Sequence, residues 1–222
     1  MFEWLNQWNG YTEAIQSIQG LISLPHFRIA AFMIAVWALW FARQGDTERL
    51  ETRISLIALL LVATVNMAIT RAFANFLPYS ARPIHTENYS VILREDQDAG
   101  ILDGWNSMPS DHASLAMCLA VGLLMIHRNT GIFLVIWAIF VVSIPRVITA
   151  LHWPSDVVVG WAIGALSAVL LLGVAKWLVR RSGIVPFFEK REAWGYPLLF
   201  LATYEVAVMF DFARFVLLSV IE

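Results

Sequence analysis

The chain has 222 residues, of which 59% are hydrophobic and only 14% are charged, and its formal net charge is −2. The apolar residues come in runs near the length that crosses the hydrocarbon core of a bilayer, so the composition excludes a soluble enzyme and predicts an integral membrane protein. We expect the bilayer as a partner, and no nucleic acid.

Residues 1–24 predict an amphipathic helix that lies flat in the membrane interface. Their apolar side chains recur at intervals of three and four residues, which places them on one helical face, and the aromatic members would anchor that face: Trp4, Trp8, Tyr11, Ile15, Ile18 and Ile22. Glu3, Glu13 and the absence of a continuous apolar core argue against a signal peptide. A partly ordered tail is the alternative.

Residues 25–222 predict a bundle of six membrane-spanning helices. A backbone in hydrocarbon must satisfy its own hydrogen bonds, so apolar runs of this length form helices rather than open strands. The fold class is therefore all-α, with an external loop at residues 77–109 between the second and third spans. The predicted spans are Phe27 to Phe41, Ile54 to Ala74, Ala113 to Ile126, Gly131 to Val147, Val157 to Leu178 and Tyr196 to Leu218.

The distribution of basic residues predicts the orientation of these spans. Lys and Arg gather on the cytoplasmic side of membrane proteins. If the loop between the first two spans is cytoplasmic, that side holds nine of the fifteen basic residues: Arg43, Arg49, Arg53, Arg128, Lys176, Arg180, Arg181, Lys190 and Arg191. The loop at residues 77–109 and the polar segments beside it would then face outward.

Polar residues that are far apart in sequence converge on this outer face. Ionisable groups at membrane depth are costly, and a set of them indicates function. A single Arg or His at a helix end could instead extend its side chain to the lipid headgroups, but that explanation does not cover the whole set. The set consists of Arg82, Ser110, Asp111, His112, Arg146, His152 and Asp156.

These residue types suit the cleavage of a phosphoester. Ser110 follows a proline and is the predicted N-cap of a helix, whose free N–H groups bind phosphate well. Arginine adds planar forks that match phosphate oxygens. Two histidines supply a nucleophile and an acid, and Asp156, four residues after His152, can hold one nitrogen of that imidazole.

The motifs resemble the signatures of the type 2 phosphatidic acid phosphatase (PAP2) superfamily, K-x6-R-P, P-S-G-H and S-R-x5-H-x3-D. The matching stretches are "RP" at 82–83, "PSDH" at 109–112 and "RVITALHWPSD" at 146–156. The resemblance implies a phosphatase without metal or cofactor that forms a phosphohistidine. His152 would be the nucleophile, Asp156 its orienting partner and His112 the general acid. The phosphate would be held by Arg82, Arg146, Ser110 and the neighbouring Asp111.

The chain departs from these signatures at three positions. Asn75 stands at the lysine of the first signature, Asp111 at the glycine of the second and Pro145 at the serine of the third. Arg71, one turn before Asn75, is the nearest substitute for the lost cation. The sequence P-S-D-H and the missing lysine also occur in undecaprenyl pyrophosphate phosphatases of the bacitracin-resistance type, which the chain resembles in size.

The resemblance implies a lipid phosphate or diphosphate substrate, with undecaprenyl pyrophosphate the first choice, at the outer face of a bacterial cytoplasmic membrane. Phosphatidic acid and phosphatidylglycerol phosphate are alternative substrates, and transfer of the phosphoryl group to another lipid is an alternative reaction. A transporter or scaffold that binds a ligand without turnover is the alternative outside enzymes. The loop at 77–109 is either a lid or a solvated linker, and the oligomeric state is left open.

Overall fold

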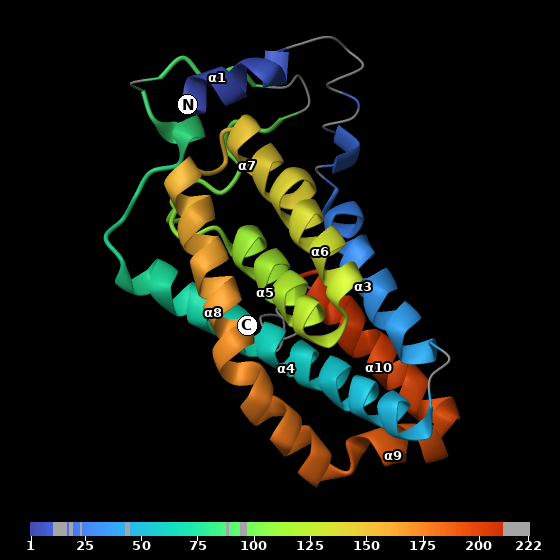
Figure 1. Cartoon of the computed structure of the whole chain (residues 1–222). Helices are drawn as coiled ribbons and strands as arrows, with labels where there is room; N and C mark the ends of the chain where they lie inside the picture. Colours follow the sequence, from blue (N-terminus) through green and yellow to red (C-terminus); the bar gives the residue numbers. More distant parts are fainter. Residues whose placement is uncertain are drawn as a thin grey trace.

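The computed structural model describes residues 1–10, 17, 20–22, 24–42, 45–87, 89–93 and 97–210. Every regular element within these residues is a helix, which confirms the predicted all-α class (Figure 1). The short α1 (Phe2–Asn6) and η1 (Gln7–Gly10) come first, and η2 (Pro83–His85) lies in the loop of residues 77–109. The other helices are α3 (Pro25–Phe41), α4 (Asp46–Phe76), α5 (Asp111–Ile126), α6 (Arg128–Trp137), η3 (Ala138–Ser143), α7 (Ile144–Ile148), α8 (Pro154–Ser182), α9 (Ile184–Lys190) and α10 (Glu192–Ala207).

Three helices in the described residues are long and apolar enough to cross a membrane. They are α4, the continuous helix Arg128–Ile148 formed by α6, η3 and α7, and α8. They contain the predicted second, fourth and fifth spans, while the predicted first and third spans coincide with shorter apolar helices at Phe27–Phe41 and Asp111–Ile126. The predicted sixth span runs past the end of α10 at Ala207, and its residues 211–218 lie outside the described residues. The count of six spans stays a prediction.

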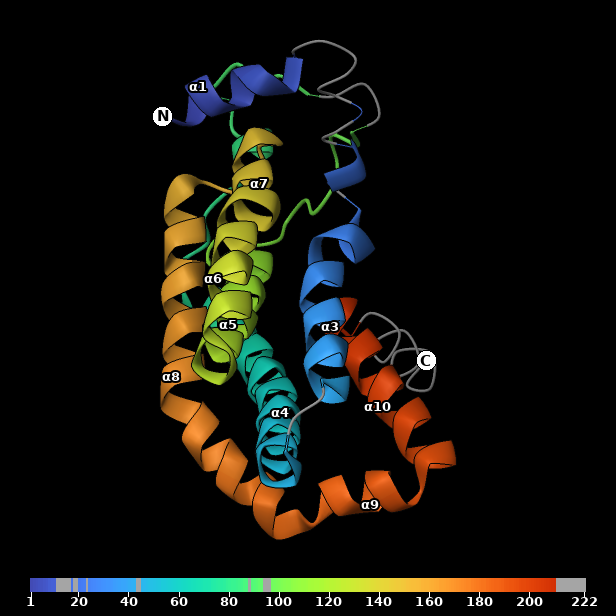
Figure 2. The same ribbon diagram turned by 45° about the vertical axis from the view of Figure 1, so that its right-hand side comes forward.

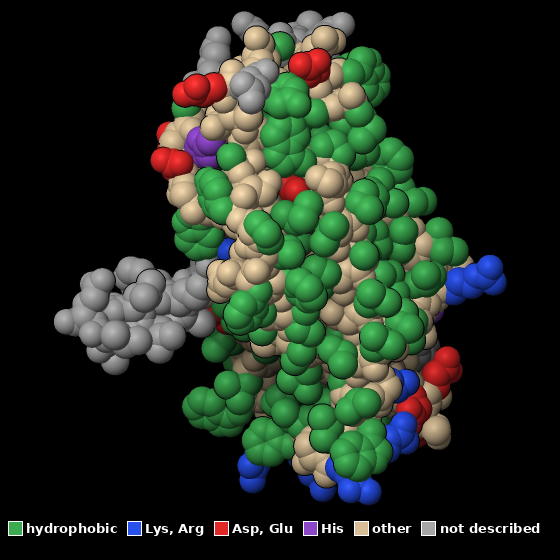
Figure 3. Space-filling view, turned by 90° about the vertical axis from the view of Figure 1, so that its left-hand side faces the viewer, with side chains coloured by type: hydrophobic (Ala, Val, Ile, Leu, Met, Phe, Trp, Pro, Cys, Tyr) green, Lys and Arg blue, Asp and Glu red, His purple; other side chains and the backbone are tan. Residues whose placement is uncertain are grey.

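Helix α5 lies at the centre of the bundle, packed against α4, α6 and α8. Figures 1 and 2 show α1 across one end of the bundle and α9 across the other, with α3 and α10 side by side. Figure 3 shows hydrophobic side chains over the middle of one face, with most of the visible Lys and Arg at the end opposite α1. An apolar surface of this extent suits contact with lipid rather than water.

Two glycines bring α8 against α5 at backbone distance. A Cβ added at Gly160 would lie 2.7 Å from the carbonyl oxygen of Ser110, and one added at Gly164 would lie 2.1 Å from that of Ser114. Small residues four apart allow membrane helices to approach this closely. The contact fixes the first turn of α8 beside the first turn of α5, and these turns carry Asp156 and His112.

Substituting Gly164 is therefore expected to separate the two helices that carry the predicted site. Because backbone atoms of α5 cannot yield as a flexible side chain would, Gly164→Ala should lower the free energy of unfolding by about 1–3 kcal/mol and reduce phosphate release. Gly173→Ala on the same helix is the matched control, since a Cβ there meets nothing within 4 Å. Equal melting temperatures and activities for the two variants would contradict this account of the packing.

A π-helical turn interrupts the helix that carries Arg146. Pro145 has no N–H and its ring crowds the preceding turn, so an α-helix cannot continue unchanged through it. The backbone widens over η3, where the Ser143 hydroxyl donates to the Ala138 carbonyl at 2.7 Å and accepts from the Trp161 indole at 2.9 Å. Pro145, one of the departures from the family signature, thus lies between the π turn and Arg146.

The N-terminal segment is fixed to the bundle by buried asparagines. The Asn6 amide donates to the carbonyl oxygens of Ile92 and Ile148, at 3.1 and 2.9 Å, and its own oxygen accepts from the Ile92 N–H. Asn9 donates to the same Ile92 carbonyl at 2.8 Å. Neither asparagine belongs to the apolar face predicted from the sequence, and the structure shows both side chains buried against the protein.

Aromatic residues of the same segment divide between the protein and its surroundings. Phe2 is buried and packs against Trp153, with ring centroids 5.1 Å apart, whereas Trp4 and Trp8 are exposed. Exposed indoles at one end of the bundle agree with the predicted interfacial anchor. Much of the predicted helix, including Tyr11, Ile15 and Ile18, lies outside the described residues, so the interfacial helix over 1–24 stays a prediction.

Candidate active site

His152 lies in the short turn between α7 and α8 and is 2% exposed. Its Nδ1 is 2.8 Å from the carbonyl oxygen of Ser107 and 3.7 Å from Oδ2 of Asp156. The longer distance exceeds a hydrogen bond, so the Ser107 carbonyl is the acceptor for an Nδ1–H. This hydrogen-bond pattern assigns the tautomer in which Nε2 carries no proton.

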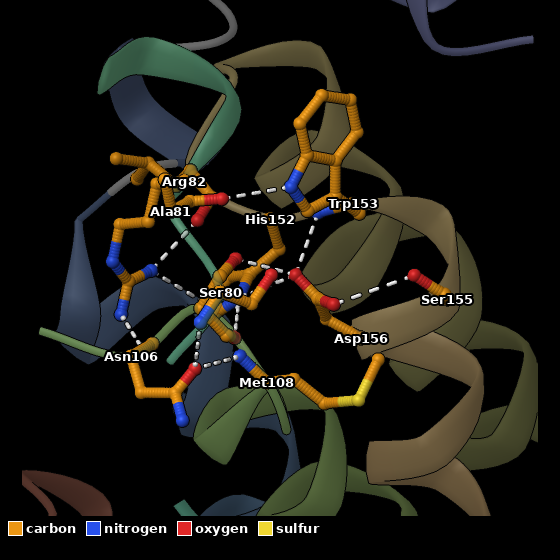
Figure 4. Close-up of polar contacts among 11 residues, drawn as sticks. Ser80, Ala81, Arg82, Asn106, Met108, His152, Trp153, Ser155 and Asp156 are labelled. Atoms are coloured by element: carbon orange, nitrogen blue, oxygen red, sulfur yellow. Dashed lines mark hydrogen bonds and ion pairs between the residues drawn. The ribbon is translucent and has the colours of Figure 1, made fainter. Parts of the chain in front are cut away.

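Asp156 is fully buried and organises the turn around His152 rather than bonding directly to the imidazole. Its Oδ2 accepts from the Ser107 hydroxyl and, at 2.8 Å, from the N–H of Trp153, which caps the start of α8 (Figure 4). The spacing in the sequence led us to expect a direct contact with His152. The structure inserts Ser107 between them, and nothing in the sequence around Ser107 singled it out.

Arg82 joins the first signature to the third. It is 5% exposed, donates through Nη1 to the carbonyl oxygen of Leu151 at 2.6 Å, and places Nη1 3.2 Å from Nε2 of His152. Figure 4 shows Arg82 and His152 near Trp153, whose indole donates to the Ala81 carbonyl at 2.9 Å. Burial lowers the pKa of Arg82, while Asp111 and Asp156 oppose that shift. The arginine is thus held by backbone oxygens against the free face of the imidazole.

Asn106 is a second residue that the sequence did not single out. Its carbonyl accepts from Nη2 of Arg82 at 3.2 Å, and its side-chain oxygen accepts from the N–H groups of Ser80 and Met108 at 3.1 and 3.3 Å. Its amide donates to the Ala74 carbonyl at the end of α4, at 2.9 Å. Asn106 therefore fastens both ends of the loop at residues 77–109 around Arg82.

A cavity of about 350 Å³ collects most of the predicted site residues. Among the predicted residues, Asn75 lines a neighbouring pocket instead. Within the described part of the chain, no group of three or more His, Cys, Asp or Glu side chains is placed to hold a metal ion. The cavity is lined by Arg28, Ile29, Arg71, Arg82, Ile101, Leu102, Trp105, Asp111, His112, Arg146, His152, Ala207, Val208 and Met209.

The start of α5 supplies one wall of the cavity. Ser110 is the N-cap, as predicted, but its N–H donates to the Asp156 carbonyl at 3.1 Å, while its buried hydroxyl has no hydrogen-bond partner among the described residues. The next residue, Asp111, forms an ion pair with Arg71 at 2.8 Å, and the Arg71 guanidinium lies 5.0 Å from the Trp105 ring centroid. The first turn of a helix leaves its N–H groups without intrahelical acceptors.

The cavity is also lined by an arginine that the sequence analysis did not single out. Arg28, in the first turn of α3, is 4% exposed and places Nη2 3.4 Å from Nε2 of His112. Arg146 is 7% exposed, and its Nε has no hydrogen-bond partner among the described residues. Nothing in the sequence around Arg28 marks it as a site residue, and only the packing of α3 on α5 brings it to the cavity.

Burial lowers the pKa of His152 to about 4; Arg146 and Arg82 act in the same direction and Asp156 opposes them. If the unprotonated imidazole is the nucleophile, the acid limb of kcat/KM should fall near pH 4 rather than near the value of about 6.5 usual for histidine. The measurement is kcat/KM of the purified protein as a function of pH. Each value is corrected for the ionised fraction of the free substrate, which is determined by phosphorus NMR. A corrected limb between pH 6 and 7 would contradict it.

The chain is similar in sequence to known proteins. The family model described as the PAP2 superfamily matches residues 78–180. The Bacitracin transport permease protein BcrC of Bacillus licheniformis is 26% identical over 74% of this chain and 77% of its own length. Undecaprenyl-diphosphatase BcrC of Bacillus subtilis (strain 168) is 24% identical over 69% of each chain.

A third relative, the Lipid A 4'-phosphatase of Bacteroides thetaiotaomicron, is 32% identical over 56% of each chain. No solved structure matches the chain. The matched region contains residues 78–109 of the loop, α5 and the turn of His152, and so includes the R-P pair of the first signature and the other two signatures. The chain is therefore similar to the PAP2 superfamily over residues 78–180, and the comparisons support a lipid phosphatase.

Proposed function

We propose that the chain hydrolyses the terminal phosphate of a lipid diphosphate through a phosphohistidine, with undecaprenyl pyrophosphate as the substrate. The observation that carries this proposal is the single cavity where His152 and His112 meet four arginines, at the end of an apolar bundle. The apolar residues Ala207, Val208 and Met209 complete its lining. A lining of this kind suits an amphiphile whose phosphates enter the cavity while its tail stays in lipid.

In the first step, Nε2 of His152 attacks the terminal phosphorus and the bond from phosphorus to the leaving oxygen breaks. His112 donates a proton to that oxygen. In the second step, water attacks the phosphohistidine, inorganic phosphate leaves, and His112 takes the proton from the water. The tautomer held by the Ser107 carbonyl, with Nδ1–H donating, supports this use of Nε2.

The charge that develops on the phosphoryl oxygens needs fixed donors. We assign this role to Arg82, Arg146, the Ser110 hydroxyl and the N–H groups in the first turn of α5. Arg82 now donates toward Nε2 of His152 at 3.2 Å, so a bound phosphoryl group would take over that donor as it approaches the nucleophile. Arg71, held by Asp111 at the cavity edge, is our candidate for the cation missing at Asn75.

We further propose six membrane spans, an N-terminal interfacial helix and a site that faces outward from a bacterial cytoplasmic membrane. The predicted positive-inside bias supports this orientation, because α1 and the loop at 77–109 lie at one end of the bundle and most of the visible basic side chains lie at the other (Figures 1 and 3). The loop is part of the site rather than a plain linker, since Ile101, Leu102 and Trp105 line the cavity.

The test is phosphate release by purified protein in detergent, with a chelator present, from a panel of lipids. The panel holds undecaprenyl pyrophosphate, phosphatidic acid and phosphatidylglycerol phosphate, and each reaction is also run with an unphosphorylated lipid acceptor. Preferred turnover of undecaprenyl pyrophosphate supports the proposal. Faster turnover of phosphatidic acid or phosphatidylglycerol phosphate would show that undecaprenyl pyrophosphate is not the preferred substrate. Formation of a phosphorylated acceptor without release of free phosphate would show that the reaction is phosphoryl transfer and not hydrolysis.

A further inference from the structure

Arg28 is fixed at the cavity by contacts that no family signature includes. Its carbonyl oxygen accepts from the Trp137 indole at 3.0 Å, which ties the first turn of α3 to α6. Its side chain is 4% exposed and reaches His112, yet its buried Nε has no hydrogen-bond partner among the described residues. A buried guanidinium with an unused donor is costly, so this arrangement points to a ligand that completes its hydrogen bonds.

The charge of the cavity exceeds what a single phosphate requires. Among the described residues that line it, four arginines face one carboxylate, which leaves an excess of three positive charges before any proton on the histidines is counted. That carboxylate, Asp111, is paired with Arg71, and Asp156 lies behind His152 rather than on the cavity wall. A phosphate monoester carries roughly −2 at neutral pH, and a second phosphate adds about one more negative charge.

The arginines are also separated by position. Arg82 lies beside Nε2 of His152, at 3.2 Å, where the attacked phosphoryl group must sit, whereas Arg28 lies beside His112, at 3.4 Å, where the leaving oxygen must sit. For a diphosphate substrate, the leaving oxygen belongs to the second phosphate. Arg28 is therefore on the side of the phosphate that stays attached to the lipid.

We propose that Arg28 selects lipid diphosphates by binding the phosphate that remains on the lipid product. This inference rests on the proposed phosphatase function and names its substrate class. As the bond between the phosphates breaks, negative charge grows on the oxygen of the leaving phosphate, and a guanidinium next to it stabilises that charge. A lipid monophosphate has an alkoxide in this place and offers Arg28 no anionic group before the bond breaks.

The experiment compares the diphosphate and the monophosphate of one polyprenol as substrates for the wild type, Arg28→Gln and Arg28→Lys. Arg28→Gln should lower kcat/KM for the diphosphate by about 10²–10³-fold, as loss of one charge-stabilising donor does, and for the monophosphate by less than about tenfold. Arg28→Lys should recover part of the diphosphate activity, since a point charge replaces the fork. The ratio of the two kcat/KM values is the readout.

Arg53→Gln is the matched control for loss of a buried arginine. Arg53 is 8% exposed, pairs with Glu189 and donates to the Trp40 carbonyl, away from the cavity. It should leave the substrate ratio unchanged even if the protein melts earlier. Equal losses of Arg28→Gln on both substrates, or the same ratio change in Arg53→Gln, would overturn the proposal. Equal losses would instead make Arg28 the replacement for the missing signature lysine.

A binding measurement separates this proposal from the proposed catalysis. Methylenediphosphonate, which is not hydrolysed, and methylphosphonate are titrated against the same variants, and the shift in melting temperature is recorded. The wild type should bind the diphosphonate more tightly, and Arg28→Gln should lose that preference. Phosphate release from neither lipid by the wild type would reject the phosphatase function alone, whereas equal binding of the two phosphonates by the wild type would reject the role of Arg28.

Discussion

His152→Ala is expected to abolish phosphate release and to leave no acid-labile phosphate on the protein. The residue would supply the only atom that bonds to phosphorus, so its removal takes away the covalent route itself, a loss of roughly 10⁴–10⁶-fold. The structure supports this position for the nucleophile, because the Ser107 carbonyl fixes Nδ1 at 2.8 Å and Nε2 faces Arg82 in the cavity. The measurement is phosphate release with acid-quenched trapping of labelled phosphate.

His127→Ala serves as the control for this experiment. His127 is exposed at the N-cap of α6 and does not line the cavity, so its loss should cost little activity. Phosphate trapped on His152→Ala at the wild-type level would move the nucleophile elsewhere, and His112 would be the first residue to examine.

The helices were predictable because hydrocarbon enforces a simple rule. Apolar runs of sufficient length must form helices, and the run from Ile54 to Ala74 lies wholly within α4. In the predicted sixth span, Tyr196 to Leu218, α10 ends at Ala207 and a turn follows at Val208–Phe210, while residues 211–218 lie outside the described residues. A continuous apolar sequence does not mark that turn, because in a membrane the same residues suit the inside and the outside of a bundle.

The site was predictable only where side-chain identity carries the chemistry. His112, Arg82, Arg146 and His152 line one cavity as the motifs implied, although their catalytic roles stay predictions. Ser107 was missed because its contact with His152 uses a backbone carbonyl, which every residue type has. Pattern reading cannot detect such a contact before the loop and the turn of His152 are brought together.

Arg28 was missed for a different reason. It stands in the second position of the predicted first span, where a lone arginine commonly extends toward the headgroups. Its burial follows from the packing of α3 near α5 and from the Trp137 bond that holds its first turn. Helix α3 is far from every signature in the sequence, so only the folded bundle shows that Arg28 reaches His112.

His112→Ala is expected to lower kcat by a factor that grows with the basicity of the leaving group. His112 lines the cavity on the side of Arg28, where we place the leaving oxygen, and its proposed task is to donate a proton there. An alkoxide is a poor leaving group without a proton, so a lipid monophosphate should lose roughly 10²–10⁴-fold in kcat. An activated aryl phosphate, which departs without protonation, should lose much less.

The same comparison separates His112 from Arg28. When a lipid diphosphate is cleaved, the leaving group is the lipid monophosphate, whose weakly basic oxygen Arg28 can stabilise by charge. His112→Ala should therefore lower kcat less for the lipid diphosphate than for the lipid monophosphate. Arg28→Gln should show the reverse order, with the diphosphate losing most. The three substrates are therefore measured on both variants under single-turnover conditions, so that product release does not hide the chemical step. Equal losses of His112→Ala on the aryl phosphate and the lipid monophosphate would show that His112 is not the general acid, because a proton donor must matter most where the leaving oxygen is most basic.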